Sequence, residues 1–177
     1  MSMPTLQVTP VTPRIGAVVS GVDLAAPLSA VIIAEIRVAW LDHQVLFFRD
    51  QDLSLDQHRD FAATFGEPYI HPTIPGPDGY PEALAIRSTS KTRKAAGEGW
   101  HTDVSASAEP PSASILRLVE VPPVGGDTLF CSMYDAYDAL SDHWKRFIDP
   151  LDAIHSAAAR HGGEFGIKSD HHPESIH

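Results

Sequence analysis

The chain has 177 residues and a formal net charge of −10 at pH 7, because 13 Lys and Arg stand against 23 Asp and Glu. This acidic balance argues against nucleic-acid binding, which requires clustered Lys and Arg to neutralise the phosphates. Hydrophobic residues make up 43% and charged residues 20%, which is typical of a single folded domain and argues against a disordered chain. No apolar run approaches the roughly 20 residues that span a bilayer, so we expect no membrane partner.

The first third of the chain alternates between extended and helical patterns. Ser29 is a typical N-cap, and apolar residues follow it at helical spacing. The run Gln44–Phe48 is compact and apolar, as in a buried strand. Ser54 begins a second helical stretch that Gly66 ends. We therefore expect strands over 5–11, 15–24 and 44–48, and helices over 30–42 and 54–66.

Residues 67–99 are rich in Pro, Gly and small polar residues, which predicts a long active-site loop or lid. Extended and helical patterns return beyond this loop, and the tail over 158–177 is polar and weakly patterned. The elements expected here are strands over 83–87, 112–121 and 151–157, and a helix over 134–147. The mixture of helices and many strands predicts a β-rich α+β domain.

Cysteine and histidine usage bear on location and chemistry. Cys131 is the single cysteine, which excludes an internal disulfide and suits a reducing compartment. The N-terminus lacks the basic and apolar regions of a secretory signal. These two observations predict a cytoplasmic protein. We also expect a homo-oligomer. Ten histidines are more than this length usually carries and need an explanation.

The sharpest local pattern is the sequence WHTD at 100–103. In an extended segment, residues i and i+2 project to the same face, so His101 and Asp103 could bind one metal ion from one side. Non-haem iron(II) oxygenases use two histidines and one carboxylate in this way and leave positions open for substrates. By itself, the pattern also fits a pair that binds no metal.

Two further His-x-acid patterns occur, where about one in total is expected by chance from ten histidines and 23 acids. His58 and Asp60 fall in a predicted helix, where residues i and i+2 diverge by about 200°. We interpret them as part of a solvated helix face. His172 and Glu174 lie in the polar tail and are interpreted as loop residues.

Two other features allow both a structural and a functional interpretation. His71 lies in the long loop, where a surface or hydrogen-bonding histidine is the simpler interpretation. The glycines of GGDT at 125–128 predict a tight turn, while a functional alternative has Thr128 face a bound anion near a metal. No GxGxxG, P-loop, CxxC or GxSxG motif is present, so nucleotide-binding, zinc-ribbon and α/β-hydrolase functions lack support.

Taken together, the segments resemble the taurine dioxygenase (TauD/TfdA) family of Fe(II)- and 2-oxoglutarate-dependent oxygenases. The matching pieces are RIGAVVSGVDL, QVLFFRDQ, SLDQHRDFAATFGEP, IHP and, most specifically, the pattern WHTD…PP…GGDT. The resemblance covers residues from about 14 to about 157 and corresponds to the N-terminal part of the family domain. It implies that residues 1–177 form one oxygenase domain. The implied fold is a double-stranded β-helix of jelly-roll or cupin type with flanking helices, incomplete at the C-terminus.

The resemblance also implies roles for individual residues. His101 and Asp103 match the first two metal ligands. Thr128 matches the residue that binds a 2-oxoglutarate carboxylate, and His71 matches the histidine that helps to bind the substrate's acidic head group. Gly97 stands where the taurine enzymes place an asparagine, so another anionic substrate is equally possible. The family's distal histidine ligand and its 2-oxoglutarate-binding arginine have no match here.

The implied function is hydroxylation of a small anionic organic substrate, such as a taurine-type alkylsulfonate, a sulfate ester or an aryloxyalkanoate. Fe(II) is the implied metal, 2-oxoglutarate and O2 are cosubstrates, and succinate and CO2 are co-products. Two alternatives stay open. One is a truncated, inactive homologue, and the other is a histidine-rich metal- or ligand-binding module without redox chemistry.

Overall fold

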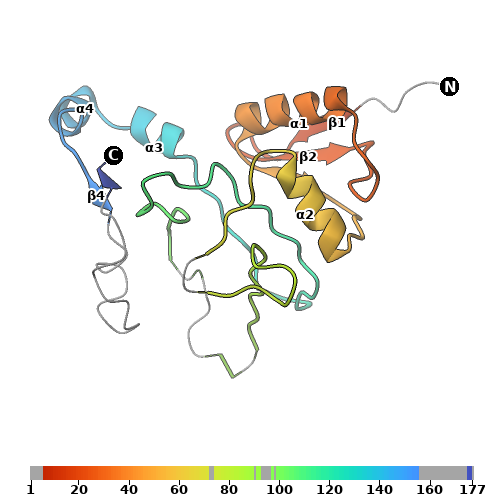
Figure 1. Cartoon of the computed structure of the whole chain (residues 1–177). Helices are drawn as coiled ribbons and strands as arrows, with labels where there is room; N and C mark the ends of the chain where they lie inside the picture. Colours follow the sequence, from red (N-terminus) through yellow and green to blue (C-terminus); the bar gives the residue numbers. More distant parts are fainter. Residues whose placement is uncertain are drawn as a thin grey trace. The chain divides into compact units, whose positions relative to one another are not determined.

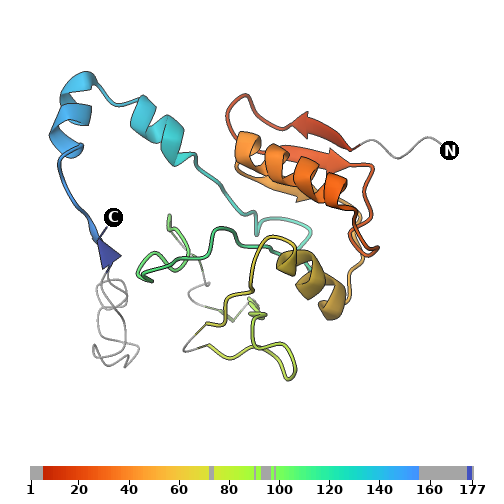
Figure 2. The ribbon, with the colours of Figure 1, turned by 45° about the horizontal axis from the view of Figure 1, so that its top comes forward.

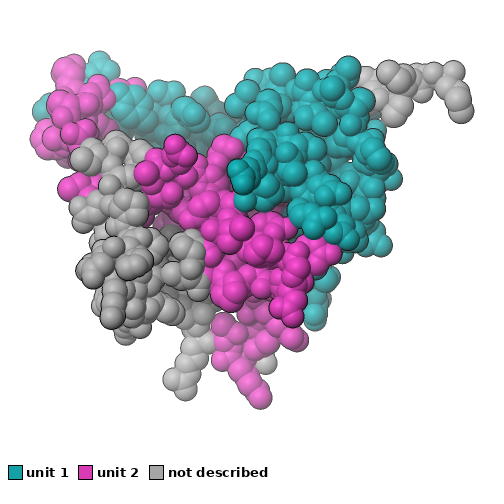
Figure 3. Space-filling model, viewed as in Figure 1, with its two compact units in different colours: residues 1–68, 117–143 teal, residues 69–116, 144–177 magenta. Residues whose placement is uncertain are grey.

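The computed structural model describes residues 6–71, 74–89, 91–92, 97, 99–155 and 175–176. The chain divides into two compact units (Figure 3). Unit 1 comprises residues 1–68 and 117–143, and unit 2 comprises residues 69–116 and 144–177.

A three-stranded sheet of order β1-β2-β3 lies in the N-terminal part of unit 1 (Figure 1). Its strands are β1 (Gln7–Pro10), β2 (Ala17–Ser20) and β3 (Leu46–Phe48). β1 pairs with β2 in antiparallel orientation, with Val8 opposite Val19, and β2 pairs with β3 in parallel orientation, with Val18 opposite Phe47. The three expected strands are confirmed, each shorter than its sequence pattern.

Gly16 allows the chain to enter β2 close to β3. Its φ of +88° lies in the left-handed region that favours glycine. Its N–H donates to the carbonyl of His43 at 2.9 Å, and a Cβ at this position would lie only 3.3 Å from Cε2 of Phe47. A side chain here would therefore strain the backbone and crowd the neighbouring strand.

Helix α1 (Ala30–His43) connects β2 to β3 and lies along one face of the sheet (Figure 2). A parallel strand pair requires such a crossover connection. Ser29 caps the helix as expected, because its Oγ accepts the N–H of Ile32 at 3.3 Å. Ile36, which is only 1% exposed, anchors the helix to the core. Among the residues that the structure describes, the buried apolar ones are Ala17, Val19, Leu24, Ile36, Ala39, Leu53 and Phe61.

Helix α2 (Leu55–Ala63) is joined to this core through aromatic side chains. The Phe61 ring packs edge-to-face on Phe48 of β3, with centroids 5.8 Å apart, and on Phe65, at 5.3 Å. Edge-to-face packing is a preferred geometry for aromatic pairs. The second expected helix is thus confirmed, and its buried ring completes the hydrophobic core beside β3.

Replacement of Ser54 by Ala is expected to destabilise the protein by about 1 kcal/mol, because it removes half of a capping box at the start of α2. In this box, the N–H of Gln57 donates to Ser54 Oγ at 3.2 Å, and the N–H of Ser54 donates to Gln57 Oε1 at 2.8 Å. Urea denaturation followed by circular dichroism measures the change. Ser54→Asp keeps a capping oxygen and should retain stability, and an equal loss in both variants would contradict the capping role.

The strands expected over 83–87 and 112–121 are wrong. The structure describes both segments, and neither is a strand. Apolar alternation is not sufficient for a strand, because the backbone N–H and C=O groups must also pair with a neighbour. Within the described residues, no neighbouring strand pairs with either segment.

The single helix expected over 134–147 is also wrong, because two helices occupy this region. They are α3 (Met133–Asp138) and α4 (Asp142–Ile148). Ser132 caps α3 by accepting the N–H of Asp135 at 3.2 Å. Ser141 followed by Asp142 is a typical start of a new helix, with an acidic residue in its first turn. These local start signals outweigh the continuous helical pattern.

A second, two-stranded sheet joins β4 (Ile154–His155) to β5 (Ser175–Ile176) in antiparallel pairing. β4 falls within the strand expected over 151–157, of which residues 156 and 157 lie outside the described residues. β5 lies in the tail over 158–177, where the sequence predicted no element. The rest of that tail lies outside the described residues.

Across the part of the chain that the structure describes, no helix combines the length and the apolar character needed to cross a membrane.

Candidate metal and substrate site

The side chains of His101 and Asp103 meet within unit 2. His101 Nε2 lies 3.2 Å from Asp103 Oδ1, and His101 Nδ1 lies 3.0 Å from the carbonyl oxygen of Gly99. Because a carbonyl oxygen can only accept, Nδ1 carries the proton of this contact. Nε2 then faces a carboxylate oxygen, which can only accept. A proton or a metal ion can bridge these two atoms.

The spacing of these two atoms fits a shared metal ion. Bonds of about 2.1 Å at right angles around an octahedral ion place adjacent ligand atoms about 3.0 Å apart, close to the observed 3.2 Å. The side chains of His101 and Asp103 are 31% and 54% exposed, so a metal ion can reach them. Among the described residues, no group of three or more His, Cys, Asp and Glu side chains forms a complete metal site.

The pair does not lie in a strand, which corrects the extended strand expected from the sequence. Asp103 begins a turn in which Val104 has a φ of +52° and accepts the N–H of Ser107 at 3.0 Å. Gly99 precedes the pair with a φ of +84°, again in the region that favours glycine. This turn begins at Asp103 and follows the pair, whereas residues 101 and 102 have no regular secondary structure. The two side chains meet although the segment is not a strand.

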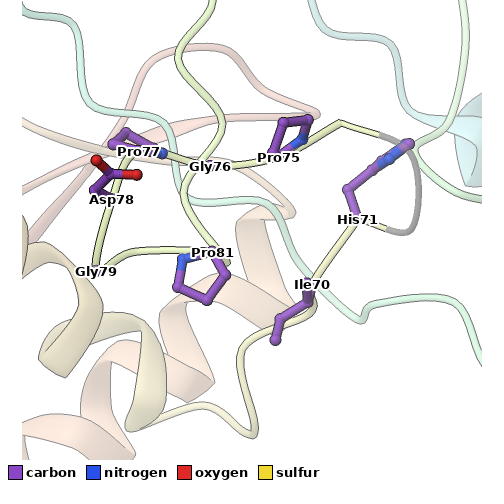
Figure 4. Close-up of a pocket in the computed structure, with 8 residues that line it drawn as sticks. All are labelled: Ile70, His71, Pro75, Gly76, Pro77, Asp78, Gly79 and Pro81. Atoms are coloured by element: carbon purple, nitrogen blue, oxygen red, sulfur yellow. The ribbon is translucent and has the colours of Figure 1, made fainter.

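His71 lines a cavity of about 550 Å³ within unit 2 (Figure 4). The N–H of Ile74 donates to His71 Nδ1 at 3.2 Å, so Nδ1 is the acceptor and Nε2 carries the proton. His71 and Asp78 lie at opposite ends of the lining (Figure 4). The other lining residues are Ile70, Pro75, Gly76, Pro77, Gly79 and Pro81. The substrate-binding role of His71 stays a prediction.

Gly76 allows the loop that forms this cavity to fold tightly on itself. A Cβ at Gly76 would collide with the carbonyl oxygen of Tyr80 and would lie 2.5 Å from that of Ala83. The N–H of Tyr80 donates to the carbonyl of Pro77 at 2.9 Å, and the N–H of Ala83 donates to that of Tyr80 at 3.1 Å. Successive turns therefore shape this part of the expected loop.

Thr128 belongs to unit 1, whereas His71, His101 and Asp103 belong to unit 2. Gly125 and Gly126, which precede it, both have a φ of +77°. Both values lie in the left-handed region that favours glycine, but no turn is formed over residues 125–128, so the tight turn expected there is not observed. Thr128 is exposed, and its role in binding 2-oxoglutarate stays a prediction.

The other His-x-acid patterns have the structural contexts expected for them where the structure describes them. His58 and Asp60 both lie in α2, where their side chains project in different directions. The Oδ1 atom of Asp60 instead lies 3.5 Å from Nε of Arg59. His172 and Glu174 lie outside the described residues.

Ser114 is a residue beside this site that the sequence did not reveal. Its Oγ donates a hydrogen bond of 2.6 Å to Asp103 Oδ2. Ser114 lies eleven positions after Asp103, so no helix or strand periodicity links them. The nearest signal is the Pro-Pro pair at 110–111, which restricts the path of the chain between them.

Comparison with known proteins gives a match to one family over nearly the whole chain. The model of the taurine catabolism dioxygenase TauD, TfdA family matches residues 7–177. An alkylsulfatase of Acinetobacter baylyi is 37% identical over 172 residues, which cover 97% of this chain and 52% of that protein. An alpha-ketoglutarate-dependent sulfate ester dioxygenase of Pseudomonas putida is 40% identical over 152 residues, which cover 85% of this chain and 50% of that protein.

A solved structure supports the same relationship. The crystal structure of a taurine dioxygenase from Burkholderia xenovorans superposes with a TM-score of 0.74 at 44% identity, and the match covers 86% of this chain and 54% of that chain. The chain thus spans about half the length of the curated relatives it matches.

Proposed function

Because the chain belongs to the TauD, TfdA family of taurine catabolism dioxygenases, we propose that this protein is an Fe(II)- and 2-oxoglutarate-dependent oxygenase that hydroxylates a small anionic organic substrate. The observation that carries the proposal is the 3.2 Å separation of His101 Nε2 and Asp103 Oδ1, which fits two adjacent ligands of one metal ion. The proposal includes the double-stranded β-helix of the family as the complete fold.

The residues of this chain would hold and orient the reacting groups. His101 Nε2 and Asp103 Oδ1 would bind Fe(II), which supplies oxidative chemistry coupled to 2-oxoglutarate when it is bound. The Gly99 carbonyl keeps the His101 ring in the tautomer that leaves Nε2 available, as partners of metal-ligating histidines usually do. The hydroxyl of Thr128 would donate a hydrogen bond to a carboxylate of 2-oxoglutarate.

His71 and the open cavity that it lines support an acidic small-molecule substrate. With its proton on Nε2, His71 offers an N–H donor to an acidic head group. A volume of about 550 Å³ lies in the range of small-molecule sites, which is about 300–1,000 Å³. Three relatives that are 37–44% identical are named for an alkylsulfatase, a sulfate ester and taurine. Two relatives named for a phenoxypropionate and for 2,4-dichlorophenoxyacetate are 31% and 34% identical. We therefore favour a sulfate ester or an alkylsulfonate over an aryloxyalkanoate.

Succinate formation tests this function directly. The protein is incubated with Fe(II), 2-oxoglutarate, O2 and one of three substrates: an alkyl sulfate, taurine or an aryloxyalkanoate. Succinate should form only when all components are present, and His101→Ala should form none. The absence of succinate with every substrate would contradict the oxygenase, while equal stimulation by a neutral alcohol would contradict the anionic substrate class.

Replacement of His71 by Ala is expected to raise KM for the anionic substrate about tenfold or more with little change in kcat, because a hydrogen bond to a charged group is lost equally in the ground and transition states. Steady-state kinetics of succinate formation measures the effect. His71→Gln keeps an N–H donor and should show a smaller rise. A KM unchanged in His71→Ala would count against the assigned role, and His43→Ala, at the end of α1, serves as a matched control.

A further inference from the structure

The two carboxylate oxygens of Asp103 have different partners. Oδ2 accepts the hydroxyl hydrogen of Ser114 at 2.6 Å, whereas Oδ1 lies 3.2 Å from Nε2 of His101. A length of 2.6 Å is that of a charge-assisted hydrogen bond from a hydroxyl to a carboxylate. One oxygen is therefore held by Ser114 while the other faces His101 Nε2.

The backbone beside Asp103 needs a restraint of this kind. Val104 is a β-branched residue with a φ of +52°, a conformation that persists only where the surrounding structure enforces it. Ser114 lies eleven residues beyond Asp103, after two prolines at 110–111 whose fixed φ angles limit the conformations of the connecting segment. The Ser114 hydrogen bond thus closes a loop around a strained turn.

We propose that Ser114 is a positioning residue for the metal site, a role that rests on the proposed function. Its hydroxyl holds Oδ2 of Asp103, so that the carboxylate cannot rotate freely and Oδ1 stays directed toward His101 Nε2. Asp103 is 54% exposed, so water would otherwise compete for both of its oxygens. Ser114 thereby prepares one ligand of the site before the metal ion arrives.

The test uses Mn(II) alone, which broadens the NMR signals of nearby nuclei. Titration of the whole chain is followed at the Thr102 amide, and the metal-free protein is followed at the Asp103 side-chain carboxyl carbon. Ser114→Ala should raise the Mn(II) concentration at half-broadening about tenfold, the lower end of the effect usual for partners of metal ligands. It should also shift the Asp103 carboxyl signal without metal.

Two matched variants separate positioning from a general effect on folding. Ser112→Ala, in the same segment, should leave both readouts as in the wild type. Ser114→Thr keeps the hydroxyl and should restore both. Wild-type Mn(II) binding and an unmoved Asp103 signal in Ser114→Ala would overturn the proposal while leaving the metal site intact. If His101→Ala bound Mn(II) as the wild type does, the proposed metal site would be contradicted, and so would the role of Ser114 that depends on it.

Discussion

Replacement of His101 by Ala is expected to abolish metal binding at the Thr102–Asp103 segment. The variant loses Nε2, and Asp103 Oδ1, 3.2 Å from that atom in the wild type, is left as a lone carboxylate ligand. Loss of a direct ligand should exceed the 10- to 100-fold effect that is usual when a partner of a ligand is lost. Mn(II) titration followed by NMR broadening of the Thr102 amide measures the change at this site and not at other histidines.

His58→Ala is the matched control for this experiment. His58 has an acidic residue two positions later, as His101 has, but both members of that pair lie in helix α2. Their side chains diverge around the helix axis, so this variant should bind Mn(II) at the 101–103 site as the wild type does. Unchanged broadening in His101→Ala would contradict the metal site and remove the observation on which the oxygenase proposal depends.

Replacement of Ile36 by Ala is expected to destabilise the protein by about 3 kcal/mol, within the range measured for deletion of buried Ile and Leu side chains. Ile36 is 1% exposed on α1, where the helix covers the three-stranded sheet, so truncation leaves a cavity that neighbours fill only in part. For a chain of this length, the loss corresponds to a fall in Tm of about 6–12 °C. Thermal denaturation followed by circular dichroism measures it.

Val38→Ala provides the comparison on the same helix. Val38 is also β-branched but is 58% exposed, so its truncation opens no cavity. The change should stay within about 0.5 kcal/mol, partly because Ala has the higher helix propensity. Similar decreases in the free energy of unfolding of the two variants would show that α1 does not bury its Ile36 face in the core.

The sequence alone determined the first third of the fold and the family. Ser29 and Ser54 both cap the helices that they were expected to begin. The patterns succeed here because capping and helical periodicity are local signals. In addition, β2 pairs with β1 and β3, which both lie close to it in the sequence. The pattern WHTD…PP…GGDT likewise indicated the family, which the match over residues 7–177 establishes.

The tertiary structure decided those features that depend on a contact between residues distant in the sequence. Residues 112–121 have strand-like alternation but no paired strand among the described residues, and β4 pairs with β5, which had no sequence signal. A strand exists only where another backbone completes its hydrogen bonds. The contact of Ser114 with Asp103 is of the same kind, because it depends on the path of the chain between them. Sequence spacing could therefore name His101 and Asp103, but only the folded loop could show what holds the carboxylate in place.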